Sequence, residues 1–362
     1  MNRKKLLFTI ILLLPALLLV VLTVNTILDI IAINRVDPQI VYQDLKDALP
    51  RRHPWSFDMP DSILGQNPSE KTVFVFGESS LILSDGGTFP EYLEKDHKGL
   101  RVVNFGVSAI DSLTVRQRVT EALSLSRPDV IILYYGHNDY NVAYHAYLLP
   151  KYFERFDLLL RLAYIFHVER NPVARFADYD FYTFARLYRP RLIRLFQKLG
   201  LIRIDQKAYE PVNQLILDQY IRNNEAILSM TSSMHIPVVV ITPVGNLHVE
   251  PHGDLNTTSL HTRGINTADY AQSIALLKKA RDAELLTYDL RAKSPLAQYI
   301  RDIRKPNVYV LDLETLLETR RFGFGNEDFV DYFHFNDRSH RLVADIIYDF
   351  MVRKKLVARE VR

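Results

Sequence analysis

The chain has 362 residues, of which 48% are hydrophobic and 11% aromatic, so it is long and apolar enough to bury a large core. A formal net charge of +3 is too small to indicate nucleic-acid binding by itself. The absence of cysteine excludes disulfides, thiol catalysis and cysteine-ligated zinc.

The N-terminal segment has the length and composition of a membrane anchor. Residues 6–24 carry no charge, and the apolar character resumes up to residue 33. Such a stretch crosses a hydrocarbon core of about 30 Å as a helix. A cleaved signal peptide is the alternative, but its apolar region typically runs only about 7–15 residues, and no A-x-A site follows residue 24. Because three basic residues precede the span, we predict residues 1–33 to be a cytoplasmic tip and transmembrane anchor, with the rest of the chain periplasmic or otherwise extracytoplasmic.

Residues 34–70 differ in composition from what precedes and follows them. They contain five prolines and show no strong periodicity apart from a possible short helix at residues 42–49. We predict a linker that separates the anchor from the folded domain.

From residue 71 to about residue 360, short apolar runs alternate with segments of helical periodicity. The predicted strands are residues 72–77, 101–106, 127–136, 236–244 and 307–313. The predicted helices are residues 89–99, 113–126, 211–232, 268–286 and 340–356. Nearly continuous β-branched runs between helices indicate a parallel sheet covered on both faces. We therefore predict an α/β domain, a three-layer doubly wound sheet of about five mainly parallel strands.

Residues with the chemistry of a serine hydrolase follow the predicted strands. Ser79 and Ser80 follow the first strand and Asn138 follows the third, while Asp331 and His334 lie three residues apart after the fifth. In doubly wound sheets, functional residues gather at the carboxyl ends of the strands. The set contains a nucleophile, a base with an orienting carboxylate, and a donor for an oxyanion.

Four short blocks at these strand ends resemble the SGNH/GDSL hydrolase family. They are GES at 77–79, N-x-G at 104–106, GHND at 136–139 and DxxH at 331–334. The resemblance covers roughly residues 71–140 and 307–350, together with the strand at 236–244. It implies an SGNH-hydrolase, flavodoxin-like fold and an esterase activity.

The resemblance also implies roles for individual residues. Ser79 is the expected nucleophile, His334 the base, and Asp331 the carboxylate that orients the imidazole. The expected oxyanion donors are the backbone N–H of Ser79, the backbone N–H of Ala109 and the side-chain amide of Asn138.

Three positions depart from the family pattern. Glu78 stands where the family has Asp, and Ser80 stands where Leu is frequent, so Ser80 is an alternative to Ser79 as nucleophile. Ala109 stands where a glycine normally supplies an oxyanion N–H. Because alanine tolerates positive φ badly, we expect either an ordinary backbone conformation at Ala109 or a shifted donor. Gly106 is expected to support the tight turn.

Other polar residues in these blocks have structural interpretations. The sequence is equally consistent with Asn104 being a residue of the site and with its being a turn residue that bonds its own backbone. Asp139 is explained as a cap of the following segment. His340 is expected to belong to the closing helix. The remaining histidines lack a spacing such as H-E-x-x-H, and no glycine-rich phosphate loop is present. We therefore expect neither a metal nor a cofactor.

Residues 141–210 form an insertion between the predicted third and fourth strands. Between residues 151 and 210 there are twelve Lys and Arg against seven Asp and Glu, and helical spacing is clear at 156–166 and 184–199. We predict an inserted helical cap. It is either a lid packed on the core by its aromatic residues, or a basic amphipathic surface facing anionic lipid or an acidic glycan. Residues 250–300 are expected to form a second loop that shapes the substrate pocket.

Three functions agree with these features. The first is a membrane-anchored serine ester hydrolase, an acyl or acetyl esterase acting on an ester-bearing small molecule, glycan or lipid. The second is an O-acyltransferase or O-acetyltransferase that passes the acyl group from the same serine to a cell-envelope glycan or lipid. The third is a non-catalytic binding module with the same fold. The expected partners are the ester substrate and the membrane, and not nucleic acid.

Overall fold

The computed structural model describes residues 3–64, 69–170, 181–285 and 290–358. At its centre lies one five-stranded, all-parallel sheet of order β2-β1-β3-β4-β5. The strands are β1 (Lys71–Gly77), β2 (Leu100–Asn104), β3 (Val130–Tyr134), β4 (Val238–Ile241) and β5 (Val308–Leu311). The predicted α/β fold is therefore confirmed, and the strand order is the flavodoxin-like one.

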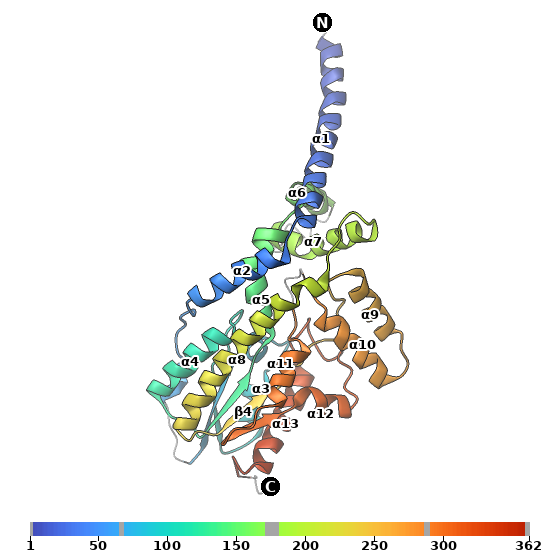
Figure 1. Cartoon of the computed structure of the whole chain (residues 1–362). Helices are drawn as coiled ribbons and strands as arrows, with labels where there is room; N and C mark the ends of the chain where they lie inside the picture. The colour runs from blue at the N-terminus through green and yellow to red at the C-terminus, as the bar shows by residue number, and fades with distance from the viewer. Residues whose placement is uncertain (1–2, 65–68, 171–180, 286–289, 359–362) are drawn as a thin grey trace.

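Helices cover both faces of this sheet, as Figure 1 shows. The α-helices after β1 are α3 (Phe89–Asp96), α4 (Ser112–Leu125), α5 (His137–Ala143), α6 (Asp157–Arg170), α7 (Phe181–Lys198), α8 (Glu210–Ser233), α9 (Leu255–Ile265), α10 (Tyr270–Asp282), α11 (Ser294–Arg301), α12 (Leu313–Thr319) and α13 (Asp337–Arg353). Each predicted helix has a counterpart, whereas α5, α9, α11 and α12 were not predicted. The predicted second loop at 250–300 is thus largely helical, and α9 begins where the side chain of Asp254 accepts a hydrogen bond from the N–H of Thr257 at 2.8 Å.

Alternation of side chains along β1 explains the two layers. Phe74 and Phe76 pack with residues of α4, α8 and α11, whereas Val73 and Val75 pack with residues of α3, α10, α12 and α13. Successive residues of a strand point to opposite faces, so an uninterrupted apolar run is what a strand buried on both faces requires. The ring of Phe76 also stacks on Phe105, just beyond β2, with centroids 4.3 Å apart.

The strand order reverses between β1 and β3, which are hydrogen-bonded neighbours although β2 lies between them in the sequence. In doubly wound sheets such a reversal leaves a crevice at the carboxyl ends of the two strands. Residues directly after β1 and β3 therefore come together at this point.

The N-terminal helix α1 (Arg3–Asn34) projects away from the body, with the N-terminus at its far end (Figure 1). Within it, residues Leu13–Asn34 have a mean hydropathy of 2.5 and are long and apolar enough to cross a membrane. The lower end of α1 is joined to the inserted segment. The carboxylate of Asp29 accepts a hydrogen bond from the N–H of Phe156 at 2.8 Å.

The segment predicted as a linker is packed against the body. Helix α2 (Pro38–Ala48) is longer than the short helix expected, and it contacts α8. Val41 and Leu45, four residues apart on one face of α2, are fully buried. The segment that we predicted to be a linker with a possible short helix therefore holds a helix that is docked on the body.

The described part of the inserted segment 141–210 is mostly helical, with non-helical stretches at 154–156 and 199–205. Helix α5 continues into the π-helical segment η4 (Tyr144–Phe153), which is followed by α6 and α7. The predicted helices at 156–166 and 184–199 correspond to α6 and α7, which pack on each other. Residues 171–180, between them, lie outside the described residues.

Candidate active site

The first strand delivers Ser79 to the carboxyl edge of the sheet. Strand β1 ends at Gly77, where any side chain would overlap the carbonyl oxygen of Tyr134 on β3. Oγ of Ser79 then lies 2.7 Å from Nε2 of His334. The neighbouring Ser80 is fully buried, and its hydroxyl has no hydrogen-bond partner among the described residues. Of the two adjacent serines, Ser79 is the one that meets the histidine.

Asp331 and His334 lie in the loop before α13 and contact each other. Nδ1 of His334 lies 2.6 Å from Oδ2 of Asp331. The other carboxylate oxygen accepts the N–H groups of Phe333 at 3.0 Å and His334 at 2.9 Å. Burial alone would raise the pKa of Asp331, but the hydrogen bond and charge of His334 and the two N–H donors hold it below its ordinary value. An ionised carboxylate on Nδ1 leaves Nε2 free to accept a proton from Ser79.

A pocket of about 260 Å³ opens beside this serine–histidine pair. It is lined by Ser79, Leu83, Ser108, Ala109, Asn138, Asn141, Val142, Tyr332, Phe333 and His334. All three residues expected to donate to an oxyanion are therefore at one cavity.

Three donors at this pocket lack acceptors within the described parts of the chain. They are the backbone N–H groups of Ser79 and Ala109 and the side-chain nitrogen of Asn138, which is buried. Buried polar groups are nearly always hydrogen-bonded, so unpaired donors facing a cavity need an explanation. Donors left free beside a nucleophile are what a developing negative charge on a substrate oxygen requires.

Of the two expectations for Ala109, an ordinary backbone conformation or a shifted donor, the ordinary conformation is wrong. The φ of Ala109 is 60°, in the left-handed region that glycine adopts without cost. The loop therefore keeps the conformation that a glycine would have, at a cost of about 1–2 kcal/mol for a residue with a Cβ. The residue lines the pocket, so the strained conformation presents its backbone there.

Asn104 and Gly106 hold the turn next to the nucleophile. The side-chain oxygen of Asn104 accepts the N–H of Gly106 at 2.9 Å, and its amide donates to the carbonyl of Leu81 at 2.9 Å. A Cβ on Gly106 would lie 2.6 Å from Cβ of Leu81. Asn104 is thus a turn residue, and it also ties the end of β2 to the turn that begins at Ser79.

Glu78 has a role that the sequence analysis did not foresee. It is fully buried, and its carboxylate accepts the N–H groups of Gly136 at 3.1 Å, His137 at 2.8 Å and Asn138 at 2.8 Å. Burial raises the pKa of Glu78 to about 8, against the effect of these three donors. Glu78 thus joins the end of β1 to the start of α5 and holds Asn138 beside Ser79. The signal for this role that the sequence offered was a charged residue between the glycine that ends a strand and the serine that follows it.

Helix α5 is also held from its other side by residues 290–292. The side-chain amide of Asn141 donates to the carbonyl of Leu290 at 2.9 Å and accepts its N–H at 2.6 Å. Nδ1 of His137 accepts the N–H of Ala292 at 3.0 Å. Burial first, and then the positive charges near it, lower the pKa of His137 to about 3, so it is a neutral structural acceptor. Asn141 was missed because its partner lies 149 positions away.

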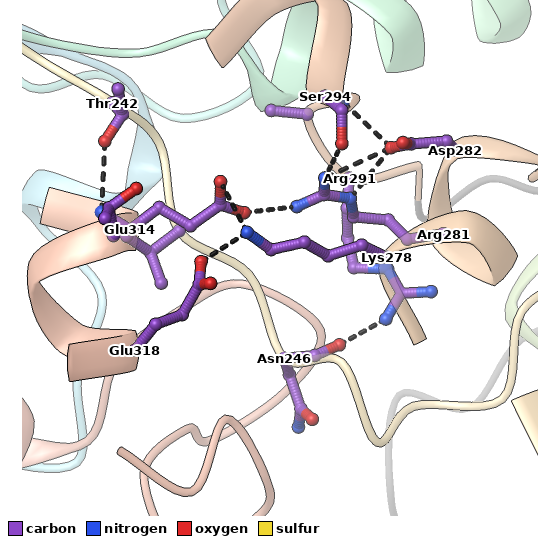
Figure 2. Close-up of polar contacts among 12 residues, drawn as sticks. Thr242, Asn246, Lys278, Arg281, Asp282, Arg291, Ser294, Glu314 and Glu318 are labelled. Carbon is purple, nitrogen blue, oxygen red and sulfur yellow. Dashed lines mark hydrogen bonds and ion pairs between the residues drawn. The ribbon is translucent and has the colours of Figure 1, made fainter. Parts of the chain in front are cut away.

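A buried ionic network fixes the segment that holds α5 (Figure 2). Arg281 donates to Glu314 at 2.8 Å and to the hydroxyl of Ser294 at 2.8 Å, and Lys278 lies 3.1 Å from Glu314. Arg291 donates to the carbonyl oxygen of Asn246. Buried charges need such partners, since one left alone is strongly destabilising. The network therefore stabilises the segment that positions α5 at the site.

Asp139 caps a different helix from the one expected. Its carboxylate accepts the N–H of Ser112 at 3.3 Å and also its hydroxyl, at the start of α4. Burial, together with the nearby charge of Asp111, raises the pKa of Asp139 to about 8. His340 lies on α13, as predicted. Within the described ranges, no three His, Asp or Glu side chains are grouped so as to hold a metal ion.

The flavodoxin-like parallel sheet and the serine, histidine and aspartate at its carboxyl edge are typical of serine hydrolases. The family model of the GDSL-like lipases/acylhydrolases matches residues 73–347, and the chain belongs to this family. It is an esterase-type hydrolase. Comparison with curated proteins gives no match.

Solved structures similar to this chain have low sequence identity. A lipase/acylhydrolase from Enterococcus faecalis is 13% identical, with a TM-score of 0.38, and the match covers 80% of this chain and 100% of that one. A lipolytic protein of the G-D-S-L family from Veillonella parvula is 12% identical, with a TM-score of 0.38 and coverages of 78% and 99%. An acetyl-xylooligosaccharide esterase from Geobacillus is 14% identical, with a TM-score of 0.37 and coverages of 81% and 96%. At such values the assignment depends on the family match.

Proposed function

We propose that the chain is a membrane-anchored serine esterase that hydrolyses short-chain acyl esters through Ser79, His334 and Asp331. The observation that carries this proposal is the continuous hydrogen-bonded series from Ser79 Oγ through both ring nitrogens of His334 to Asp331, beside a pocket with unpaired donors. Nothing in this arrangement requires a metal or a cofactor.

The proposed reaction has two steps. Oγ of Ser79 attacks the ester carbonyl while Nε2 of His334 takes the hydroxyl proton, and Asp331 stabilises the imidazolium that forms. The oxyanion of the tetrahedral intermediate is held by the N–H groups of Ser79 and Ala109 and the amide of Asn138. The C–O bond to the alcohol then breaks, and His334 returns the proton to the leaving oxygen. Water, activated by His334, hydrolyses the acyl-enzyme by the same steps.

The dimensions of the pocket support a small acyl group. Its volume of about 260 Å³ lies just below the range of about 300–1,000 Å³ for sites that enclose a whole drug-sized ligand. Leu83, Val142 and Phe333 give the lining an apolar part. We infer that the acyl group, acetyl or a little longer, enters the pocket, while the alcohol portion of a glycan, lipid or small molecule stays outside.

Several contacts join the last turns of α1 to the body, so the apolar helix continues without a break into the folded domain. Ile33 is buried against the body, and Asp29 and Asn34 are both hydrogen-bonded to the inserted segment. Cleavage after Asn34 would remove these contacts, whereas cleavage near Val24 would leave them in place. We propose an anchor at residues 1–33, a packed connector at 34–70 and a catalytic domain at 71–360 with an inserted cap at about 141–210, the domain lying outside the cytoplasm.

The test is hydrolysis of p-nitrophenyl esters of increasing chain length by the detergent-solubilised full-length protein. We expect kcat/KM to be highest for acetate or butyrate and to fall for chains of eight or more carbons. Activity that rises with chain length would contradict the proposed pocket. Transfer of the acyl group to an added sugar alcohol in preference to water would indicate an acyltransferase.

A further inference from the structure

We propose that the C-terminal end of α7 and the residues after it form a second membrane contact, an interfacial patch that lies among the headgroups of anionic phospholipids. The patch consists of Leu195, Lys198, Leu199, Leu201 and Arg203. This inference rests on the proposed role of α1 as an anchor, and it adds a lipid-binding surface to the inserted cap.

The depth of the patch follows from its bonds to α1. Residues 6–28 are uncharged and, at 1.5 Å per residue, are about 35 Å long, enough to cross the hydrocarbon core. The next residue, Asp29, is the first charge and marks the start of the headgroup layer. Asn34, five residues further, lies about 7.5 Å along the helix axis, within a headgroup layer of about 5–8 Å.

Asn34 is bonded directly to the patch. Its side-chain amide donates to the carbonyl of Leu201 at 2.7 Å, and its side-chain oxygen accepts the N–H of Arg203 at 2.9 Å. Phe156, which donates to Asp29, contacts the ring of Phe196 on α7, with centroids 5.2 Å apart. Two contacts therefore join the end of α7 to the last turns of α1, so the patch lies at the same depth as these turns. Figure 1 shows α6 and α7 between α1 and the sheet domain.

The chemistry of the patch fits this depth. Leu195 on α7 and Leu199 just after it are four residues apart, joined by a hydrogen bond from the N–H of Leu199 to the carbonyl of Leu195, and they are 49% and 61% exposed. Leu201 is 47% exposed. Lys198 and Arg203 are exposed beside them. In the described part of the chain, no carboxylate forms an ion pair with either cation. Exposed leucines interleaved with basic residues are typical of helices that lie in the membrane interface.

Charge determines which lipid the patch should prefer. A basic side chain near an anionic bilayer strengthens binding by about fivefold. Because Lys198 and Arg203 flank the leucines, we expect phosphatidylglycerol to be preferred over phosphatidylcholine. The alternatives to lipid headgroups as the binding partner of the patch are an acidic glycan and a second copy of the chain.

The absence of cysteine permits a direct measurement of depth. Full-length protein carrying a nitroxide at Leu199→Cys is reconstituted in nanodiscs of phosphatidylcholine with phosphatidylglycerol, or of phosphatidylcholine alone. Leu17→Cys, in the exposed middle of α1, reports the anchor, and Leu125→Cys, at the exposed end of α4, reports water. Collision with oxygen and with a water-soluble nickel chelate is measured for each label.

We expect the oxygen-to-nickel ratio at Leu199 to lie between the values at Leu17 and Leu125, and to be higher in anionic nanodiscs. Reversing the charges with Lys198→Glu and Arg203→Glu should lower this ratio, whereas Lys279→Glu on α10 should not. A Leu199 label as exposed to nickel as Leu125, with Leu17 inside the bilayer, would overturn the patch alone. A Leu17 label that is exposed to water would overturn the proposed anchor as well as the patch. Hydrolysis of a soluble ester measures the esterase activity independently of both.

Discussion

Nε2 of His334 lies 2.7 Å from Oγ of Ser79, although 255 positions separate the two residues in the chain. The serine follows the central strand β1, and the histidine lies in the loop that precedes the closing helix α13. Helix α13 packs on the same face of the sheet as α3, so the two ends of the domain are adjacent. The site therefore depends on the whole domain being folded.

The adjacent serines provide a matched pair of variants. We expect Ser79→Ala to lower kcat/KM by at least about 10³-fold, because the variant lacks the hydroxyl group that lies next to Nε2 of His334. Ser80→Ala should leave activity within a few-fold of wild type and should not lower the melting temperature, since its hydroxyl has no partner to lose among the described residues. Ester hydrolysis and thermal unfolding measure both. Loss of activity only in Ser80→Ala would reverse the assignment of the nucleophile.

Asp331→Asn tests the orientation of the imidazole. The asparagine keeps an oxygen for the N–H groups of Phe333 and His334, so the loop should remain folded. The amide favours the wrong tautomer of His334, and we expect kcat to fall by about 10²–10⁴-fold, with a much smaller change in KM. Steady-state kinetics with p-nitrophenyl acetate decides this. An unchanged kcat would exclude Asp331 from the mechanism.

Asn138 tests the oxyanion donors. Asn138→Ala removes one donor at the pocket, and we expect a loss of about 10²–10³-fold in kcat. Asn138→Asp keeps the size of the side chain but places a carboxylate where the donor was, so its loss should be at least as large. Circular dichroism confirms that both variants fold. Wild-type turnover in Asn138→Ala would assign the oxyanion to the backbone donors alone.

Ala109→Gly should stabilise the protein. At a φ of 60°, removing the Cβ relieves about 1 kcal/mol of backbone strain, while the N–H of residue 109 is retained. We expect a higher melting temperature and little change in kcat. Ala109→Val, the opposite change, should destabilise the protein by more than the glycine stabilises it. A less stable glycine variant would mean that the left-handed conformation is not maintained in solution.

Glu78 predicts a dependence of stability on pH. Its pKa rises from 4.5 to about 8 on folding, so between these values the folded chain binds a proton that the unfolded chain releases. The free energy of unfolding should therefore fall as pH rises from about 5 to 8, by up to about 1.4 kcal/mol per pH unit from this group. Asp139, whose pKa is also raised to about 8, acts in the same direction.

The matched variants for this prediction are Glu78→Gln and Asp139→Asn, examined by urea unfolding at several pH values. Each should make the slope shallower, because one titrating group is removed. Glu78→Gln should also lower kcat, since an amide nitrogen replaces one acceptor of the N–H groups that position Asn138. Asp139→Asn has no such contact with Asn138. Slopes identical to wild type in both variants would contradict the raised pKa values.

Much of the fold and part of the site could be predicted from local sequence. The alternation of Val and Phe before Gly77, and the apolar runs at the other strands, depend on neighbours in the chain and on burial of both faces. Three of the four blocks directly follow a strand, so the parallel sheet alone predicts that Ser79 and Asn138 approach one another, whereas the block with His334 comes after α12. The spacing of Asp331 and His334 is local in the same sense.

What the sequence by itself determined is thus the sequence of strands and helices, the apolar N-terminal helix, and the residue types at the carboxyl edge. Only the tertiary structure decided that Ser79 rather than Ser80 meets the histidine, that Glu78 holds the start of α5, and that α1 is bonded to the inserted segment. The reason is physical. Periodicity and turn chemistry act over a few residues, whereas these contacts join segments tens to hundreds of positions apart, and their geometry is set by how the layers pack.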